Sequence, residues 1–89
     1  MNDSEKFSIV RTILLRDWDP IIVGDNPHLI DEYDHYIPGI IELLDRRCSA
    51  ESIERHLRQI EANAMGLTPP LEQAHRAARN LVSFWNAAA

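Results

Sequence analysis

The sequence predicts an all-α fold, a compact four-helix bundle-like single domain over residues 1–89 with a short irregular loop between the first two helices. Apolar residues recur at spacings of three and four in four separate segments. The stretches between these segments hold proline, glycine and capping residues. The composition, with 45% hydrophobic and 26% charged residues, is that of a globular protein rather than a disordered chain. We expect an ordered core over about residues 5–86.

The first helix is predicted from about Ser4 to Asp17, with Asn2 as its N-terminal cap. Pro20 lacks a backbone N–H and disfavours helical backbone at the residue before it, so the helix should end at Trp18-Asp19-Pro20. We expect residues 20–27 to form a loop that plugs the core. The residues expected on the inward face are Phe7, Ile9, Val10, Ile13, Leu14 and Trp18.

The second helical segment covers about residues 31–47 and contains a proline, Pro38. A proline costs about 3 kcal/mol inside a helix but little in the first turn, where the backbone N–H has no helical partner. We therefore favour a helix that begins near Asp34 over an irregular turn followed by a kinked helix. Its apolar stripe is expected to contain Tyr33, Ile37, Ile40, Ile41 and Leu44.

Ser49 is the expected cap of a third helix over about residues 50–65, and Gly66 is expected to close it in a left-handed conformation. Thr68 should cap a fourth helix, with Pro69 at its first position and an end near Asn86. The inward residues of the third helix are expected to be Ile53, Leu57, Ile60 and Ala64. Those of the fourth are expected to be Leu71, Ala74, Ala78, Leu81, Val82 and Trp85.

The large aromatic residues divide into two groups. Trp18, Trp85 and Phe7 lie on apolar stripes and are expected to meet in the core. Phe84 lies off the main stripe of its helix, which predicts a surface position or a contact with a second copy of the chain.

Charge and cysteine content exclude several classes of protein. The net charge is −5 and the isoelectric point is near 5.2, so nucleic acid is not expected as a partner. The single cysteine, Cys48, cannot form an internal disulfide. The polar first residues predict no secretory signal, and no apolar run is long enough to span a membrane. We expect a cytoplasmic protein with no membrane partner.

The negative charge is concentrated in one stretch, because residues 17–34 hold six acids and neither Lys nor Arg. Three interpretations remain open: complementation of a helix dipole, a docking surface for a basic partner, or a divalent-metal site. A calcium loop beginning at Asp17 would have Ile22 in place of the required glycine. We call these six residues the acidic corner: Asp17, Asp19, Asp25, Asp31, Glu32 and Asp34.

Two histidines offer a weak alternative metal site. If residues 28–35 were helical, His28, Glu32 and His35 would share one face and could form a two-histidine, one-carboxylate ligand set. Pro27 and Pro38 oppose a long helix there, so solvated histidines are the simpler interpretation. No nucleophile elbow or glycine-rich phosphate loop is present in the sequence, and we expect no catalytic residues and no cofactor.

Two short motifs, Trp18-Asp19-Pro20-Ile21 and Asp31-Glu32-Tyr33-Asp34, together resemble those of an uncharacterised family of small bacterial all-helical proteins. The resemblance spans about residues 5–86 and implies an all-α cytoplasmic bacterial protein, without an established activity. The motifs also have a direct physical interpretation. Tyr33 can bury its ring while its hydroxyl contacts Asp19, which would join the motifs into one structural corner marked by Trp18, Pro20 and Tyr33.

The function expected from these features is that of a non-catalytic protein-binding module. Its acidic corner would meet a basic protein, as in an immunity-type protein that covers a toxin or in a regulatory protein. One alternative is a small metal-dependent enzyme built on the histidine and carboxylate cluster. Another is a homo-oligomeric structural protein, a homodimer formed through Phe84 and the C-terminal helix.

Overall fold

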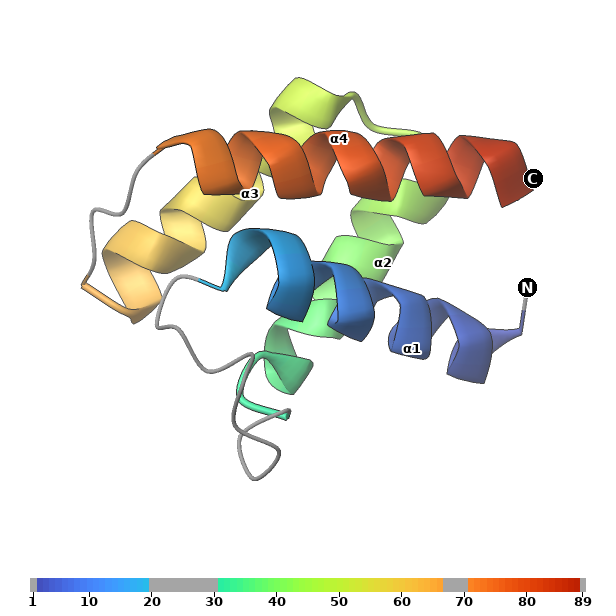
Figure 1. The fold of residues 1–89 in the computed structure, drawn as a ribbon, viewed down its shortest axis with the longest axis horizontal. Helices are drawn as coiled ribbons and strands as arrows, with labels where there is room; N and C mark the ends of the chain where they lie inside the picture. Colours follow the sequence, from blue (N-terminus) through green and yellow to red (C-terminus); the bar gives the residue numbers. More distant parts are fainter. Residues whose placement is uncertain (1, 20–30, 67–70, 89) are drawn as a thin grey trace.

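The computed structural model describes residues 2–19, 31–66 and 71–88, and these residues form helices and turns without a strand (Figure 1). The prediction of an all-α, four-helix fold is therefore confirmed. Two of the helices continue into π-helical turns, and one is preceded by a 3-10 turn. In chain order the elements are α1 (Asp3–Ile13), η1 (Leu14–Trp18), η3 (Asp34–Tyr36), α2 (Ile37–Asp45), α3 (Ala50–Gln59), η4 (Ile60–Ala64) and α4 (Leu71–Ala88).

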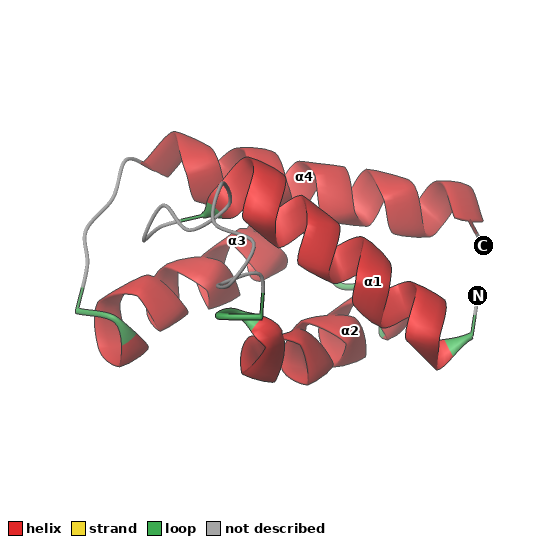
Figure 2. Cartoon of the chain, turned by 60° about the horizontal axis from the view of Figure 1, so that its bottom comes forward, coloured by secondary structure: helices red, strands yellow, loops and turns green. Residues whose placement is uncertain are grey.

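The helices α1 and α4 lie side by side and run in opposite directions, so that the two ends of the chain lie at the same end of the molecule (Figures 1 and 2). α3 and α4 form the most extensive contact between two helices. Ala74, Ala77 and Ala78 of α4 are fully buried. Small side chains at buried positions of a helix allow neighbouring helices to pack closely.

The helix ends follow the capping residues in the sequence. The Asn2 side chain accepts a hydrogen bond from the backbone N–H of Glu5 at 2.8 Å, and the Ser49 hydroxyl accepts one from Ser52 N–H at 3.2 Å. Pro38 lies in the first turn of α2, after the 3-10 turn that begins at Asp34. The predicted start of the second helix and both of these caps are therefore confirmed.

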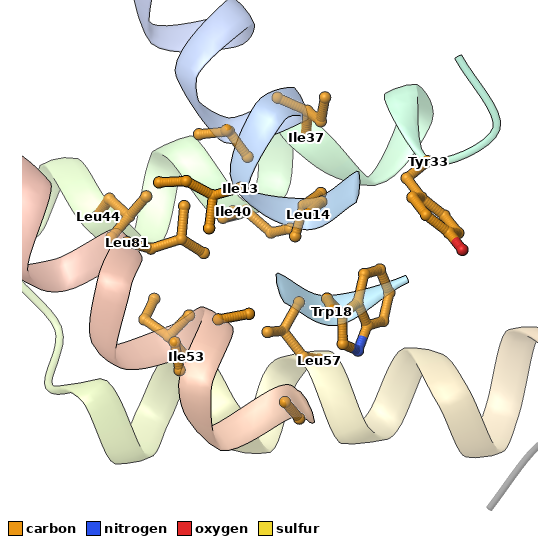
Figure 3. Packing of buried hydrophobic residues seen from close by; sticks show 14 of the residues in the cluster. Ile13, Leu14, Trp18, Tyr33, Ile37, Ile40, Leu44, Ile53, Leu57 and Leu81 are labelled. Atoms are coloured by element: carbon orange, nitrogen blue, oxygen red, sulfur yellow. The ribbon is translucent and has the colours of Figure 1, made fainter. Parts of the chain in front are cut away.

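The core contains most of the predicted inward residues (Figure 3). Phe7 is only partly buried, which corrects its expected place in the core. Ala64 is exposed because the π-helical turn η4 has more residues per turn than an α-helix and displaces Ala64 from the buried face, while Glu61 is buried. Leu71, the first residue of α4, is 57% exposed, so its expected inward position is also wrong. Phe84 is 45% exposed, which confirms its surface position.

Some expectations concern residues that lie outside the described ranges. They are the loop over residues 20–27 and the capping role of Thr68 with Pro69. Within the described part of the chain, no helix combines the length and the apolar character needed to cross a bilayer.

Gly66→Ala is expected to lower the free energy of unfolding by about 1 kcal/mol, because Gly66 has φ +63° and a side chain is strained there even where space is available. Gly39→Ala is the matched control. Gly39 lies within α2, where a Cβ would make only an ordinary contact with His56, so alanine should raise the free energy by about 0.5–1 kcal/mol. Urea denaturation measures both. Equal effects of the same sign would contradict the assigned backbone conformation at Gly66.

Candidate functional site

The two sequence motifs meet at one end of the core. The indole ring of Trp18, fully buried at the end of η1, lies 5.2 Å from the ring of Tyr33 between centroids. The Tyr33 hydroxyl donates a hydrogen bond to Oδ1 of Asp19 at 2.7 Å. The predicted contact between Tyr33 and Asp19 is confirmed. Pro20, the third marker of the structural corner, lies outside the described residues.

The π-helical turn η1 sets the position of this corner. The backbone N–H of Asp19 donates to the carbonyl of Leu14, five residues earlier, at 2.8 Å. Asp19 then adopts a left-handed conformation with φ 31°, which ends the helix directly after Trp18. π-Helical turns are uncommon in proteins, but those that occur are frequently found at functional sites. The side chains held by η1 and η4 are therefore candidates for such a site.

Glu61 of η4 is the buried partner of Trp18. The indole N–H of Trp18 donates to Oε2 of Glu61 at 2.7 Å, and Glu61 is only 4% exposed. Burial raises the pKa of Glu61, while the Trp18 hydrogen bond and the charge of Arg58 act in the opposite direction without cancelling it. In Figure 3 the indole nitrogen of Trp18 points toward the helix that continues into η4. This carboxyl group links η1 to η4.

Asp17 of η1 is a second buried carboxylate, and it faces α4. Its carboxylate accepts hydrogen bonds from Arg16 at 3.0 Å and from Asn80 at 2.9 Å, and Arg76 lies 3.8 Å away. Burial by itself would raise the pKa of Asp17. The hydrogen bonds from Arg16 and Asn80 and the charges of both arginines outweigh burial and hold this pKa below its usual range.

The remaining residues of the acidic corner have different surroundings. Asp34 accepts two hydrogen bonds from the guanidinium group of Arg11, which also lies over the ring of Phe7. Asp31 and Glu32 are exposed, in the turn that precedes η3. Asp25 lies outside the described residues.

These positions correct the picture of a uniformly exposed acidic corner. Asp17 is buried, so its carboxylate is not part of the surface, and Asp19 and Asp34 accept hydrogen bonds from other parts of the chain. Buried carboxylates require such partners, because the loss of hydration would otherwise oppose folding. Asp31 and Glu32 are the described acids of the corner that remain exposed.

Sequence reasoning missed Glu61, Arg76 and Asn80. Glu61 follows Ile53 and Leu57 at four-residue spacings, so it continues their buried face, and a buried tryptophan needs an acceptor for its N–H. Arg76 and Asn80 are separated by four residues on α4, which places both on one face of that helix. That this face meets Asp17 could not be inferred from spacing.

The alternative metal-ligand set is only partly described. His28 lies outside the described ranges, while Glu32 is exposed and the exposed His35 packs on Tyr36 with ring centroids 4.4 Å apart. Among residues 2–19, 31–66 and 71–88, no group of three or more His, Cys, Asp or Glu side chains is arranged to hold a metal ion.

The fold and the corner define a small all-α domain in which two buried carboxylates join separate helices. Comparison of the chain with family models, with curated proteins and with solved structures finds no match. The resemblance suggested by the two motifs therefore stays a prediction.

Proposed function

We propose that the domain is a non-catalytic protein-binding module that presents the exposed acids of its corner to a basic protein. An immunity-type role, in which it covers a basic toxin, or a regulatory role fits this chemistry. The proposal includes a cytoplasmic location, which a chain with one cysteine and therefore no internal disulfide fits.

One observation carries the proposal: Tyr33 anchors the turn that bears the exposed acids. Its ring is 1% exposed, and its hydroxyl is bonded to Asp19, so the backbone on either side is held against the core. Asp31 and Glu32 project into solvent from this fixed turn. Adjacent carboxylates on a fixed surface create a local negative potential, which accelerates encounter with a basic partner and costs little ordering on binding.

The test is affinity capture from a lysate of the source organism at low ionic strength, followed by titration with the captured protein. The double variant Asp31→Lys/Glu32→Lys should lose a basic partner that the unmodified chain retains, with at least a tenfold weaker affinity, equivalent to about 1.4 kcal/mol. The matched control, Glu51→Lys/Glu72→Lys, replaces two exposed acids on α3 and α4 and changes net charge equally.

The control separates a specific contact from attraction by net charge. Binding that is weakened equally by both double variants would mean that the turn has no special role. The failure of the unmodified chain to retain any basic protein at low salt would also contradict the proposal.

A further inference from the structure

A groove runs between α1 and α4 and is open at the surface. It has a volume of about 190 Å³ and is lined by Ser8, Ile9, Thr12, Ile13, Arg16 and Phe84. Phe84 leaves 45% of its surface exposed, although it belongs to a helix whose other large apolar side chains beyond the first turn are at least partly buried. Exposed aromatic side chains beside a groove are typical of surfaces that bind another protein.

The charged residues of this face are ordered along α1 and its continuation η1. Glu5, Ile9, Thr12 and Arg16 follow one another at spacings of four, three and four residues, which places them on one side of the helix. Glu5 is exposed near the start of the helix, and the Arg16 side chain is 62% exposed near its end. The face is therefore negative at one end, uncharged in the middle, where Ile9, Ile13 and Phe84 lie beside two hydroxyl side chains, and positive at the other end.

The positive end keeps a net charge despite its internal ion pairs. Arg16 and Arg76 both contact Asp17, so two guanidinium groups share one carboxylate. The Arg76 side chain is 50% exposed. Among residues 2–19, 31–66 and 71–88, Asp17 is the acid paired with these two arginines, so one positive charge is left over at the surface and is available to a carboxylate from outside the chain.

We propose that this face binds a second copy of the chain through a twofold axis, with the two α1 helices antiparallel. Glu5 would then meet the partner's Arg16, and Arg16 would meet the partner's Glu5. The two positions are about 16 Å apart along the helix, and their midpoint falls beside the groove, so the axis would bring the two Phe84 rings together. A twofold interface requires a self-complementary surface, and this order of charges supplies one. The inference does not depend on the proposed function.

The first test compares two exposed apolar residues of α4. Sedimentation of the chain from about 10 μM to about 1 mM, the range of weak association, should show a monomer–dimer equilibrium. Phe84→Ser should raise the dissociation constant by about tenfold or more, as expected for an aromatic side chain at the centre of an interface. Leu71→Ser, which removes a 57% exposed apolar side chain away from the groove, should leave it unchanged.

The second test uses the charges. Glu5→Arg and Arg16→Glu, each alone, should weaken self-association, because like charges would meet at both ends of the interface. An equimolar mixture of the two variants should form a heterodimer, because each variant supplies the charge that the other needs. Since Arg16 also contacts Asp17, helix content and thermal melting verify that Arg16→Glu is folded. Glu51→Arg replaces an exposed acid on α3 and is the control for Glu5→Arg. Neither of these two variants changes Arg16, so their comparison does not depend on the folding of Arg16→Glu.

Three results would overturn the inference. One is a strict monomer over the whole concentration range, which would leave the groove to a different partner. Another is an equal effect of Phe84→Ser and Leu71→Ser. The third is a mixture of folded Glu5→Arg and Arg16→Glu chains that associates no better than either variant alone.

Discussion

Trp18→Ala is expected to lower the free energy of unfolding by about 3–5 kcal/mol, the range for truncation of a large buried aromatic residue. Trp18 is fully buried, packs on Tyr33 and holds Glu61 by a hydrogen bond. Because small domains are stable by only about 5–15 kcal/mol, this loss should bring the chain close to unfolding at room temperature. Urea denaturation followed by far-ultraviolet circular dichroism measures it.

Two further variants separate packing from hydrogen bonding. Trp18→Phe keeps most of the buried ring but removes the N–H that Glu61 accepts, so it should cost about 1–3 kcal/mol through the unsatisfied buried carboxyl group. Phe84→Ala, at an aromatic residue that is 45% exposed, should cost far less than Trp18→Ala. Similar losses for Trp18→Ala and Phe84→Ala would contradict the central position of Trp18.

Glu61→Ala is expected to cost about 1–3 kcal/mol, because it leaves the buried indole N–H of Trp18 without an acceptor. Glu61→Gln keeps a carbonyl oxygen that can accept the same hydrogen bond and cannot ionise. The two variants should therefore differ in stability at neutral pH, with Gln the more stable. Equal stability of the two would show that the hydrogen bond contributes nothing.

The pH dependence of stability follows from the raised pKa of Glu61. Burial is the largest cause, so the folded chain holds this proton to a higher pH than the unfolded chain, whose value lies near 4.5. The stability that Glu61 contributes is fully present below pH 4.5 and is lost as the pH rises through the folded pKa. Glu61→Gln should not show this loss, so its stability relative to the unmodified chain should rise above pH 4.5.

Asp17 should behave in the opposite direction. Its folded pKa is lowered from 3.8, because the bonds and charges from Arg16, Asn80 and Arg76 outweigh burial. Its contribution to stability is present above pH 3.8 and is lost as the pH falls through the folded pKa. Asp17→Asn should therefore reduce the dependence of stability on pH in the acid range only.

Urea midpoints measured across pH for the unmodified chain, Glu61→Gln and Asp17→Asn test both signs. The NMR shift of the Trp18 indole N–H reports Glu61 directly. Parallel curves for Glu61→Gln and the unmodified chain would rule out an ionisable role for Glu61.

Local sequence signals were sufficient for the helices and for one contact between two neighbouring segments. Asn2, Ser49 and Pro38 mark helix starts through their own backbone and side-chain chemistry, which acts within one turn. The contact between Tyr33 and Asp19 was also predictable, because a buried tyrosine needs a partner for its hydroxyl and the two motifs lie close in the chain.

Helical spacing was a poorer guide where the helices change their pitch. The expectation for Ala64 assumed 3.6 residues per turn, but η4 is π-helical, so Ala64 is displaced from the inward face. The expectation for Leu71, the first residue of α4, was wrong for a different reason. Periodicity assigns a residue to a face of a helix but does not show how far along the helix its neighbours extend.

The sequence by itself determined that this chain forms four amphipathic helices and that its acids are concentrated between residues 17 and 34. Only the tertiary structure decided which of those acids reach solvent. Asp17 is buried, forms an ion pair with Arg76 and accepts a hydrogen bond from Asn80, which are 59 and 63 residues away along the chain. Asp34 is paired with Arg11, whereas Asp31 and Glu32 stay exposed. The reason is physical: the state of a carboxylate depends on the groups within a few ångströms, and those groups are set by helix packing.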